Sequence, residues 1–276
     1  MKIMWLDDFS FTNNADNAIS KTTGWSLYNT YIDTFSGNDT ITGYSNRSTG
    51  IQVEDGTINT GDGDDIITGN GKYNGIDLYG SRSVIYLDNW SSIDTGNGND
   101  AISGTARDRS SGAGINLVRS SINTGNGNDT ITGNGNYGIN LYNKNSINTG
   151  SGNDTITGNG REYGIFVDKN STINTGDGND NVDALEGGFS GIGKTYLGAG
   201  KDTLRGFGEG NFYGGTGKDK IFFDAGKYRI SGSSVKHDGE TMRAYEFEKI
   251  GGINGGLFDF KDGTLTVDSK GVGTFA

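Results

Sequence analysis

The sequence predicts an all-β chain wound into a right-handed parallel β-helix, a solenoid of stacked coils. The first observation is a turn motif, Gly-x-Gly-x-Asp, that has eight copies in the 276 residues, the first of them with Phe35 in place of the first glycine. Its aspartates, spaced 26, 35, 29, 25, 26, 22 and 17 residues apart, are Asp39, Asp65, Asp100, Asp129, Asp154, Asp180, Asp202 and Asp219. A motif repeated at intervals of this size is typical of a solenoid in which each repeat forms one coil.

The second observation is the alternation of aliphatic and polar residues around each turn. Three rows of aliphatic residues are expected to stack inside the solenoid, while the intervening Asn and Thr point outward. The first row is Ile58, Ile93, Ile122, Ile147 and Ile173. The second is Ile41, Ile67, Ile102, Ile131, Ile156 and Val182. The third is Ile76, Ile115, Ile139 and Ile165.

Each coil is therefore predicted to contain three short strands. In the fourth coil these are Ile-Asn-Thr at 122–124, Thr-Ile-Thr at 130–132 and Gly-Ile-Asn-Leu at 138–141. Parallel strands joined by a crossover are almost always connected with a right-handed sense. The longer second and third coils predict loop insertions at 81–90 and 105–112, and the shorter spacings after Asp180 predict narrower coils.

Composition is the third observation. The chain has 50 Gly, no Pro, no Cys and only 31% hydrophobic residues. Proline is excluded from central strands because it cannot donate a ladder hydrogen bond. Without cysteine there is no disulfide, thiolate metal site or cysteine nucleophile. The formal net charge of −11 argues against nucleic-acid binding, and we expect neither a cleavable apolar signal nor a membrane-spanning segment.

The domain organisation follows from where the repeat begins and ends. Residues 1–30 do not fit it and are expected to form an N-terminal cap, because the open end of a solenoid needs covering. Residues 31–223 are predicted to form about eight coils. Residues 224–276 contain short alternating strands and are predicted to form a small C-terminal β cap, with an export signal as the alternative role.

The turn resembles the calcium-binding repeat of the RTX, or haemolysin-type, proteins. The resemblance is carried by Gly-Asp-Gly-Asp-Asp-Ile-Ile at 61–67 and Gly-Gly-Thr-Gly-Lys-Asp-Lys-Ile at 214–221, and it covers residues 32–223. In five central copies a threonine replaces the first glycine of the family pattern, the first copy begins Phe35-Ser36, and the sixth ends in Ala184. The coil is also longer than the 18 or so residues of an RTX β-roll, which predicts calcium turns on only one edge.

The spacing of the turns supports the same metal on physical grounds. Stacked coils would place the aspartates about 4.8 Å apart, where two carboxylates repel by roughly 3.5 kcal/mol at an effective dielectric constant near 20. Calcium, bound by six to eight oxygen atoms, fits carboxylates and turn carbonyls better than magnesium or zinc. We expect roughly five to seven ions, and folding coupled to their binding. The expected metal ligands are the eight aspartates named above with Gly37, Gly61, Gly63, Gly96, Gly98, Gly125, Gly127, Gly150, Gly152, Gly176, Gly178, Gly198, Gly200, Gly215 and Gly217.

The function expected from the resemblance is a calcium-binding structural or binding module. It would be secreted by a bacterium or held at its cell surface, and it would be exported without an N-terminal signal. Its partners would be calcium and an extracellular polysaccharide or cell surface. A cytoplasmic location is not excluded. No catalytic residue is predicted, and the single histidine, His237, is expected in a surface turn. Asp62, Asp64 and Asp177 are expected to face water.

Two other functions remain open. The first is a polysaccharide lyase or epimerase, because charged residues of the insertion loops could meet on one face. These residues are Arg82, Asp88, Arg107, Asp108, Arg109, Arg119, Arg161 and Glu162. The second is calcium-dependent ice binding, suggested by Thr-x-Thr pairs at 40–42, 130–132 and 155–157, although the row fails at 66–68 and 101–103.

Overall fold

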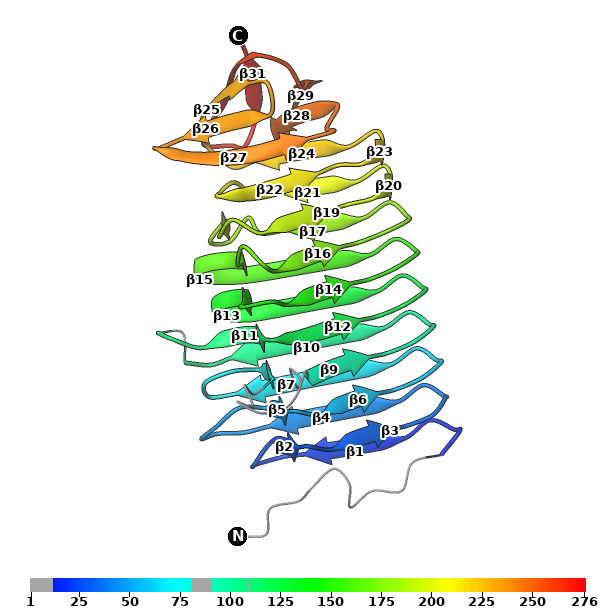
Figure 1. Ribbon diagram of the computed structural model, residues 1–276. Coiled ribbons are helices and arrows are strands. Elements are labelled where there is room, and N and C mark those ends of the chain that lie inside the picture. The colour runs from blue at the N-terminus through cyan, green and yellow to red at the C-terminus, as the bar shows by residue number, and fades with distance from the viewer. Residues whose placement is uncertain (1–11, 81–90, 109) are drawn as a thin grey trace.

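The computed structural model describes residues 12–80, 91–108 and 110–276. In these residues the chain is all-β, contains no helix and forms a parallel β-solenoid of about nine turns. Figure 1 shows the coils stacked one above another, with the first strands at one end and the last strands at the other. The predicted fold class, a parallel β-solenoid, is confirmed.

Two long sheets run along the solenoid axis. One has 16 strands: β1 (Asn17–Ser20), β2 (Trp25–Tyr28), β4 (Thr40–Tyr44), β5 (Ile51–Glu54), β7 (Ile66–Gly71), β8 (Ile76–Tyr79), β10 (Ala101–Ala106), β11 (Ala113–Val118), β13 (Thr130–Tyr142), β15 (Thr155–Val167), β17 (Asn181–Asp183), β18 (Phe189–Ser190), β21 (Thr203–Arg205), β24 (Lys220–Phe223), β28 (Lys249–Gly252) and β29 (Gly255–Asp259).

The second sheet has 13 strands: β3 (Tyr31–Asp33), β6 (Thr57–Asn59), β9 (Ser91–Asp94), β12 (Ser120–Asn123), β14 (Ser146–Asn148), β16 (Thr172–Asn174), β19 (Lys194–Tyr196), β22 (Gly210–Tyr213), β27 (Glu240–Tyr245), β26 (Ser234–His237), β25 (Gly226–Ser231), β30 (Gly263–Val267) and β31 (Gly273–Phe275). A two-stranded ladder, β20 (Ala199–Gly200) with β23 (Thr216–Gly217), lies in the turns between the sheets.

The core consists of aliphatic columns, as predicted. Ile122 pairs in parallel register with Ile93 in the coil before it and with Ile147 in the coil after it. All three are 0% exposed, and the other members of the three predicted rows are 0% or 1% exposed. Equivalent side chains therefore stack directly on one another from coil to coil, and a shift of one residue would turn the aliphatic side chains out to solvent.

Polar residues between these columns form hydrogen-bonded ladders on the outer faces. In the 13-stranded sheet, Asn148 Nδ2 donates to Asn123 Oδ1 at 2.9 Å, and Asn174 Nδ2 donates to Asn148 Oδ1 at 2.9 Å. Such cross-strand amide bonds add to the backbone ladder and favour the same register.

Both ends of the solenoid differ in extent from the sequence-based boundaries. The parallel ladder begins at Asn17, inside the segment expected to form the N-terminal cap, because β1 pairs with β4 and β2 with β5. Trp25 is 1% exposed and its indole N–H donates to the Thr42 carbonyl at 2.9 Å. This aromatic residue occupies a core position of the first coil, which the aliphatic pattern did not reveal.

At the other end, parallel pairing continues past residue 223. β28 pairs in parallel with β24, and β27 with β22. In the described part of the chain, the strand ladders of β25, β26, β29, β30 and β31 are antiparallel, and a single parallel bridge joins Gly255 of β29 to Val272. The last coils are shorter because the third strand disappears after β18, in line with the closer spacing of the final turns. The insertion expected at 81–90 lies outside the described residues.

Candidate metal centre: the aspartate column

The repeated turns connect the 13-stranded sheet to the 16-stranded sheet along one edge of the solenoid. In a typical coil the turn spans 124–129, between β12 and β13. In Figure 1 this edge is the right margin, where the labels β20 and β23 stand. Stacking of the coils brings all eight predicted aspartates into one series of adjacent turns, which we call the aspartate column.

Glycine is required in these turns because successive turns lie in close contact. Gly125 has φ of 85° and Gly127 has φ of 142°, conformations that residues with a Cβ rarely adopt. A Cβ on Gly127 would lie 1.6 Å from the carbonyl oxygen of Gly98 in the preceding coil. The sequence-predicted glycines thus allow the backbone of one turn to lie directly on the next.

Each aspartate of the column binds the backbone of the coil before it. Asp129 Oδ1 accepts a hydrogen bond from the Asp100 N–H at 2.9 Å, and Asp154 Oδ1 accepts one from the Asp129 N–H at 2.8 Å. The same bond, at 2.8 Å, joins each of the remaining pairs of successive aspartates from Asp39 to Asp219. One carboxylate oxygen in each turn is therefore committed to the fold itself.

Two acidic residues that the motif did not reveal stand at the ends of this chain of bonds. The Asp219 N–H donates to Glu248 Oε2 at 2.7 Å, so Glu248 occupies the place of a ninth aspartate. At the other end the Asp16 N–H donates to Asp39 Oδ1 at 2.8 Å. Glu248 follows Asp219 by 29 residues, within the range of coil lengths, but no Gly-x-Gly precedes it to mark the turn.

The second carboxylate oxygen has no hydrogen-bond donor among the described residues in most of the column. The aspartates are 0–2% exposed. The Oδ2 atoms that are buried without a hydrogen bond belong to Asp65, Asp100, Asp129, Asp154, Asp180, Asp202 and Asp219. Asp39 is the exception, because its Oδ2 accepts a hydrogen bond from Thr34 Oγ1 at 2.5 Å. A buried anionic oxygen without a donor is costly, so these atoms call for a further partner.

The threonines that replace the first glycine of the RTX pattern lie beside these carboxylates. Five of them, Thr60, Thr95, Thr124, Thr149 and Thr175, are 0% exposed. Thr149 and Thr175 donate their hydroxyls to the backbone carbonyl of the next coil, at 3.2 and 2.7 Å. The hydroxyls of Thr60 and Thr124 lower the pKa of Asp65 and Asp129, although their geometry falls short of a hydrogen bond.

Burial raises the pKa of the column above the ordinary aspartate value. Loss of solvation raises it to about 6 for Asp65, Asp129 and Asp180 and to about 7 for Asp100 and Asp202. The donated backbone N–H lowers the pKa in each case, and neighbouring carboxylates raise it further. The pKa is raised in the same direction for Asp39, Asp154 and Asp219. Without a cation, part of the column holds protons near neutral pH.

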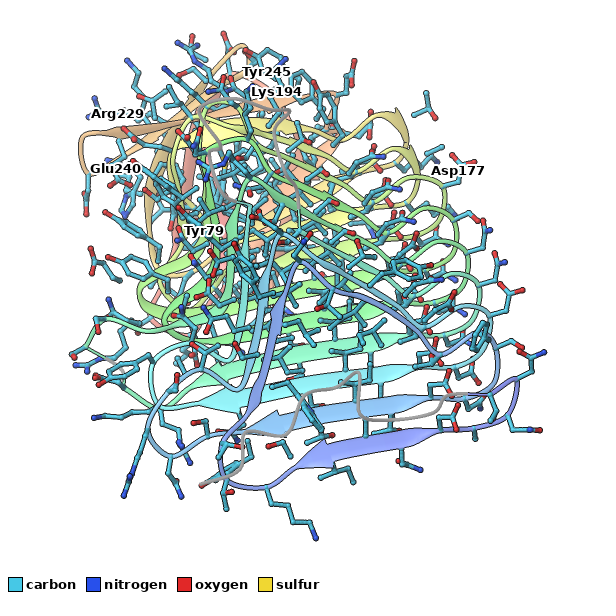
Figure 2. All side chains as sticks on the ribbon, turned by 60° about the horizontal axis from the view of Figure 1, so that its bottom comes forward. Tyr79, Asp177, Lys194, Arg229, Glu240 and Tyr245 are labelled. Atoms are coloured by element: carbon cyan, nitrogen blue, oxygen red, sulfur yellow. The ribbon has the colours of Figure 1, made fainter. Side chains whose placement is uncertain are left out.

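The variable positions of the turn face solvent. Asp62, Asp64 and Asp177 are exposed, as expected from the alternation. Figure 2 shows Asp177 projecting from the outer margin of the turns. Asp64 Oδ1 accepts hydrogen bonds from both Asn99 nitrogens, at 2.7 Å from the backbone and 3.0 Å from the side chain, and these bonds lower its pKa. The outer and inner acids of one turn therefore have opposite electrostatic environments.

The described residues contain no group of three or more His, Cys, Asp or Glu side chains converging on one point. Any ion in the column would therefore be shared by carboxylates of two adjacent coils and by backbone carbonyls. Carbonyl oxygens of Gly63, Gly98 and Gly127 accept no backbone hydrogen bond from the described part of the chain. The predicted glycines and aspartates thus offer only oxygen ligands.

The loop charges considered for catalysis are only partly described by the structure. Arg82, Asp88 and Arg109 lie outside the described residues. Of the others, Arg107 donates to the Tyr44 hydroxyl and the Ser45 carbonyl, and Arg119 to the Gly80 carbonyl. Glu162 accepts from Asn136 Nδ2 at 3.0 Å. Each of these three therefore has a structural partner, and Arg119 is buried.

His237 ends strand β26 rather than lying in a turn. Its Nδ1 is 3.2 Å from the Lys227 carbonyl oxygen, and its ring centroid lies 4.5 Å from that of Tyr228. Both neighbours hold the ring against the hairpin.

Of the two threonine rows considered for ice binding, the first is irregular in space, whereas the second keeps Thr or Ser from Thr42 to Thr157. Thr40 is followed in register by Ile66 and Ala101 before Thr130 and Thr155. Apolar side chains thus interrupt the first row along two successive coils.

No protein-family model matches the sequence, and no curated protein shows significant similarity to it. No helix capable of crossing a bilayer is found among the described residues.

Proposed function

We propose that this protein is a calcium-binding β-solenoid whose turns are ordered by the ion. It acts as a non-catalytic structural or binding module that is secreted or displayed at the surface of a bacterium. The proposal rests on one observation, the seven buried Oδ2 atoms of the aspartate column that accept no hydrogen bond from the described part of the chain.

A buried carboxylate in this position has two means of avoiding an unpaired charge. It takes up a proton, which the raised pKa values favour at mildly acidic pH, or it binds a cation. Above pH 7 the proton is lost, and repulsion along the column then disfavours the folded state unless a cation replaces it.

The available donors select the kind of cation. The turns present carboxylate and backbone carbonyl oxygens, while imidazole and thiolate are absent from the column. Calcium accepts six to eight oxygen ligands in irregular geometry, whereas magnesium requires a near-ideal octahedron. Pairs of stacked turns with flexible coordination suit calcium better than either magnesium or zinc.

Coupling between binding and folding provides the physiological role. Calcium that binds the ordered column but not the unfolded chain stabilises the fold by mass action. Such a chain stays loosely folded where calcium is scarce, as in the cytosol, and becomes rigid outside the cell. The metal thus orders and neutralises the turns rather than taking part in a reaction.

Calcium titration of chelator-treated protein, followed by isothermal and scanning calorimetry, tests this proposal. We expect uptake of roughly five to seven ions, one between most adjacent turns, and a rise in melting temperature. Asp129→Asn should reduce the number of bound ions, because the amide keeps the bond to Asp100 N–H but loses the charge. Asp177→Asn is the matched control, since Asp177 lies in the same kind of turn but is exposed, and it should leave the stoichiometry unchanged.

Two results would overturn the proposal. One is a β-type circular dichroism spectrum and melting temperature that are the same with chelator and with millimolar calcium. The other is equal loss of calcium in the Asp129 and Asp177 variants, which would place the ions on the outer surface.

A further inference from the structure

Five basic side chains cross the outer face of the 13-stranded sheet near its C-terminal end. These residues, which we call the basic stripe, are Lys194, Lys227, Arg229, Lys236 and Arg243, and they come from β19, β25, β26 and β27. Lys194 pairs with Asn211, and Asn211 pairs with Arg243. Arg229 pairs with Lys236 across the adjacent hairpin. All five are exposed and each has at least one buried neighbour along its strand, so the alternation places all five on the solvent side.

The charges of the basic stripe have no acidic partner in the part of the chain that the structure describes. None of the five forms an ion pair with an acidic side chain of the described residues. The chain as a whole carries a formal charge of −11, so a cluster of unpaired cations is a local exception to its composition. Clustered like charges repel one another, and an anionic ligand relieves that repulsion.

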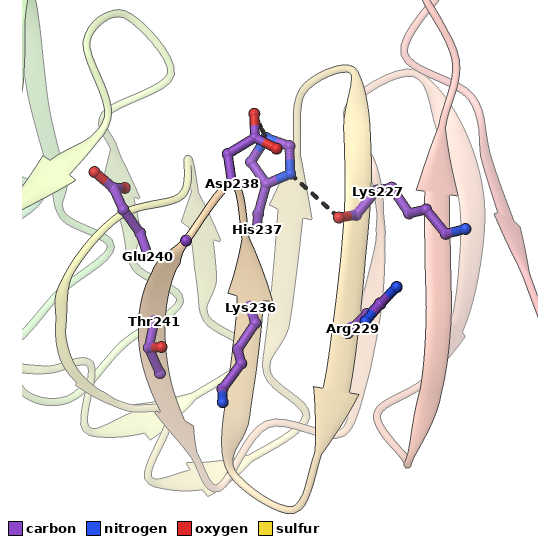
Figure 3. Close-up of a pocket in the computed structure, with 8 residues that line it drawn as sticks. Lys227, Arg229, Lys236, His237, Asp238, Glu240 and Thr241 are labelled. Atoms are coloured by element: carbon purple, nitrogen blue, oxygen red, sulfur yellow. Dashed lines mark hydrogen bonds and ion pairs between the residues drawn. The ribbon is translucent and has the colours of Figure 1, made fainter.

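The surface beside the stripe is hollowed. A cavity of about 510 Å³ is lined by Lys227, Arg229 and Lys236, and a second of about 330 Å³ by Lys236 and Arg243. Figure 3 shows the Lys236 and Arg229 side chains side by side along β26 and β25, with Asp238 and Glu240 at the hairpin end. Glu209 also lines the second cavity. Asp238 and Glu240 line the first cavity together with the basic residues, and Lys236 belongs to both cavities.

A column of tyrosines runs next to the stripe on the same face. Tyr196, Tyr213 and Tyr245 lie two residues beyond Lys194, Asn211 and Arg243 on their strands, and they are in register. Their rings are stacked, with centroids 4.7 and 4.9 Å apart. Their hydroxyls form no hydrogen bond within the described part of the chain and remain available to a ligand that carries its own hydroxyl groups.

We infer that this face binds an acidic polysaccharide, a linear polymer of uronate-type sugars. Its carboxylates would pair with the basic stripe, and its hydroxyls would exchange hydrogen bonds with the tyrosine column and with Asn211 and Thr241. Arginine and lysine suit carboxylates, and arginine holds them in bidentate geometry. This inference rests on the binding role in the proposed function but uses none of the residues of the aspartate column.

The same observations disfavour nucleic acid as the occupant. Nucleic-acid affinity depends on many phosphate contacts and on a basic domain. Here five cations stand on a strongly acidic chain, and the tyrosines stack on one another rather than presenting their faces to bases.

Binding is tested on the full chain in saturating calcium, with circular dichroism confirming the fold of every variant. The probes are polygalacturonate, neutral dextran and single-stranded DNA, measured by affinity electrophoresis and calorimetry. We expect polygalacturonate to bind best, and Lys236→Glu with Arg243→Glu to weaken it by about tenfold or more. The matched control reverses two exposed charges on other loops, Arg47→Glu with Lys169→Glu, and should change affinity less than about twofold.

A second pair of variants separates sugar recognition from simple ion exchange. Tyr213→Phe with Tyr245→Phe keeps the stacked rings and removes two hydroxyls, and it should weaken polygalacturonate binding about threefold or more. The inference is overturned by equal losses in the two charge-reversal pairs, by no loss in the phenylalanine pair, by tighter binding of DNA, or by no binding at all. Calcium uptake in the same samples reports on the aspartate column separately, so failure of one proposal is distinguishable from failure of the other.

Discussion

Asp129 accepts, through Oδ1, a hydrogen bond of 2.9 Å from the backbone N–H of Asp100, its equivalent one coil earlier. The carboxylate therefore has a structural task before any ion is considered, because it completes the hydrogen bonding of a buried turn. Its other oxygen, Oδ2, is buried without a partner. One side chain thus joins two coils and leaves an anionic atom for a cation or a proton.

Substitutions at Asp129 should separate these two tasks. In chelator, Asp129→Ala leaves the Asp100 N–H without an acceptor and should lower the free energy of unfolding by about 1–3 kcal/mol. Asp129→Asn retains an acceptor and removes a buried charge, so in chelator it should be neutral or stabilising. Urea denaturation, with hydrogen exchange of the Asp100 amide, measures both. Equal destabilisation by the two substitutions would contradict the assigned hydrogen bond.

The metal-free protein should be more stable at pH 5 than at pH 8. The pKa values of Asp100 and Asp202 are raised to about 7 in the folded state, from 3.8. The folded state therefore binds more protons than the unfolded state between about pH 4 and 7, and stability is lost as pH rises through this window. Thermal melts in chelator across pH 5–8 measure the effect.

The matched variant Asp100→Asn with Asp202→Asn should flatten this profile, because it removes the two groups with the highest raised pKa. Calcium should reverse the trend, since the ion requires the ionised carboxylates. A metal-free melting temperature that rises steadily toward pH 8 would show that the carboxylates are not buried as described.

Glycine at the second turn position should be indispensable. Gly127→Ala would place a Cβ 1.6 Å from the Gly98 carbonyl oxygen, so the stacked turns would have to separate. We expect a loss of about 3 kcal/mol or more in the free energy of unfolding. The control is Gly232→Ala, where φ is 54° and no atom lies within 4 Å of the added Cβ, and the cost should be about 1 kcal/mol. Similar costs at the two sites would refute close stacking.

Neighbouring isoleucines in β7 offer a direct test of the inward and outward faces. Ile67 is 0% exposed and Ile66 is 47% exposed. Ile67→Ala should cost about 2–5 kcal/mol because it leaves a cavity in an aliphatic column, whereas Ile66→Ala should change stability by no more than about 0.5 kcal/mol. Chemical denaturation of both variants in calcium measures these losses. A larger loss for Ile66→Ala than for Ile67→Ala would mean that the strand register is wrong by one residue.

Much of the fold could be predicted because each coil repeats the same alternation of aliphatic and polar residues and the same glycine turn. The position of Ile122 between Asn-Gly turns was enough to place it in a buried column with Ile93 and Ile147. The first coil was harder to recognise, since Trp25 and Leu27 occupy its core instead of a Gly-Ile repeat. Glu248 was missed because it stands at the end of the aspartate column without a preceding glycine turn, so only its hydrogen bond to Asp219 identifies it.

The strand order, the coil length and the buried rows follow from the amino-acid sequence, because the aliphatic residues and the glycine turns recur with each coil. Which oxygen of each aspartate accepts a hydrogen bond is visible only in the folded protein, and so is the common face of five cations from four different strands. These contacts join residues on separate coils and hairpins, and the distances between such residues cannot be calculated from the sequence repeat.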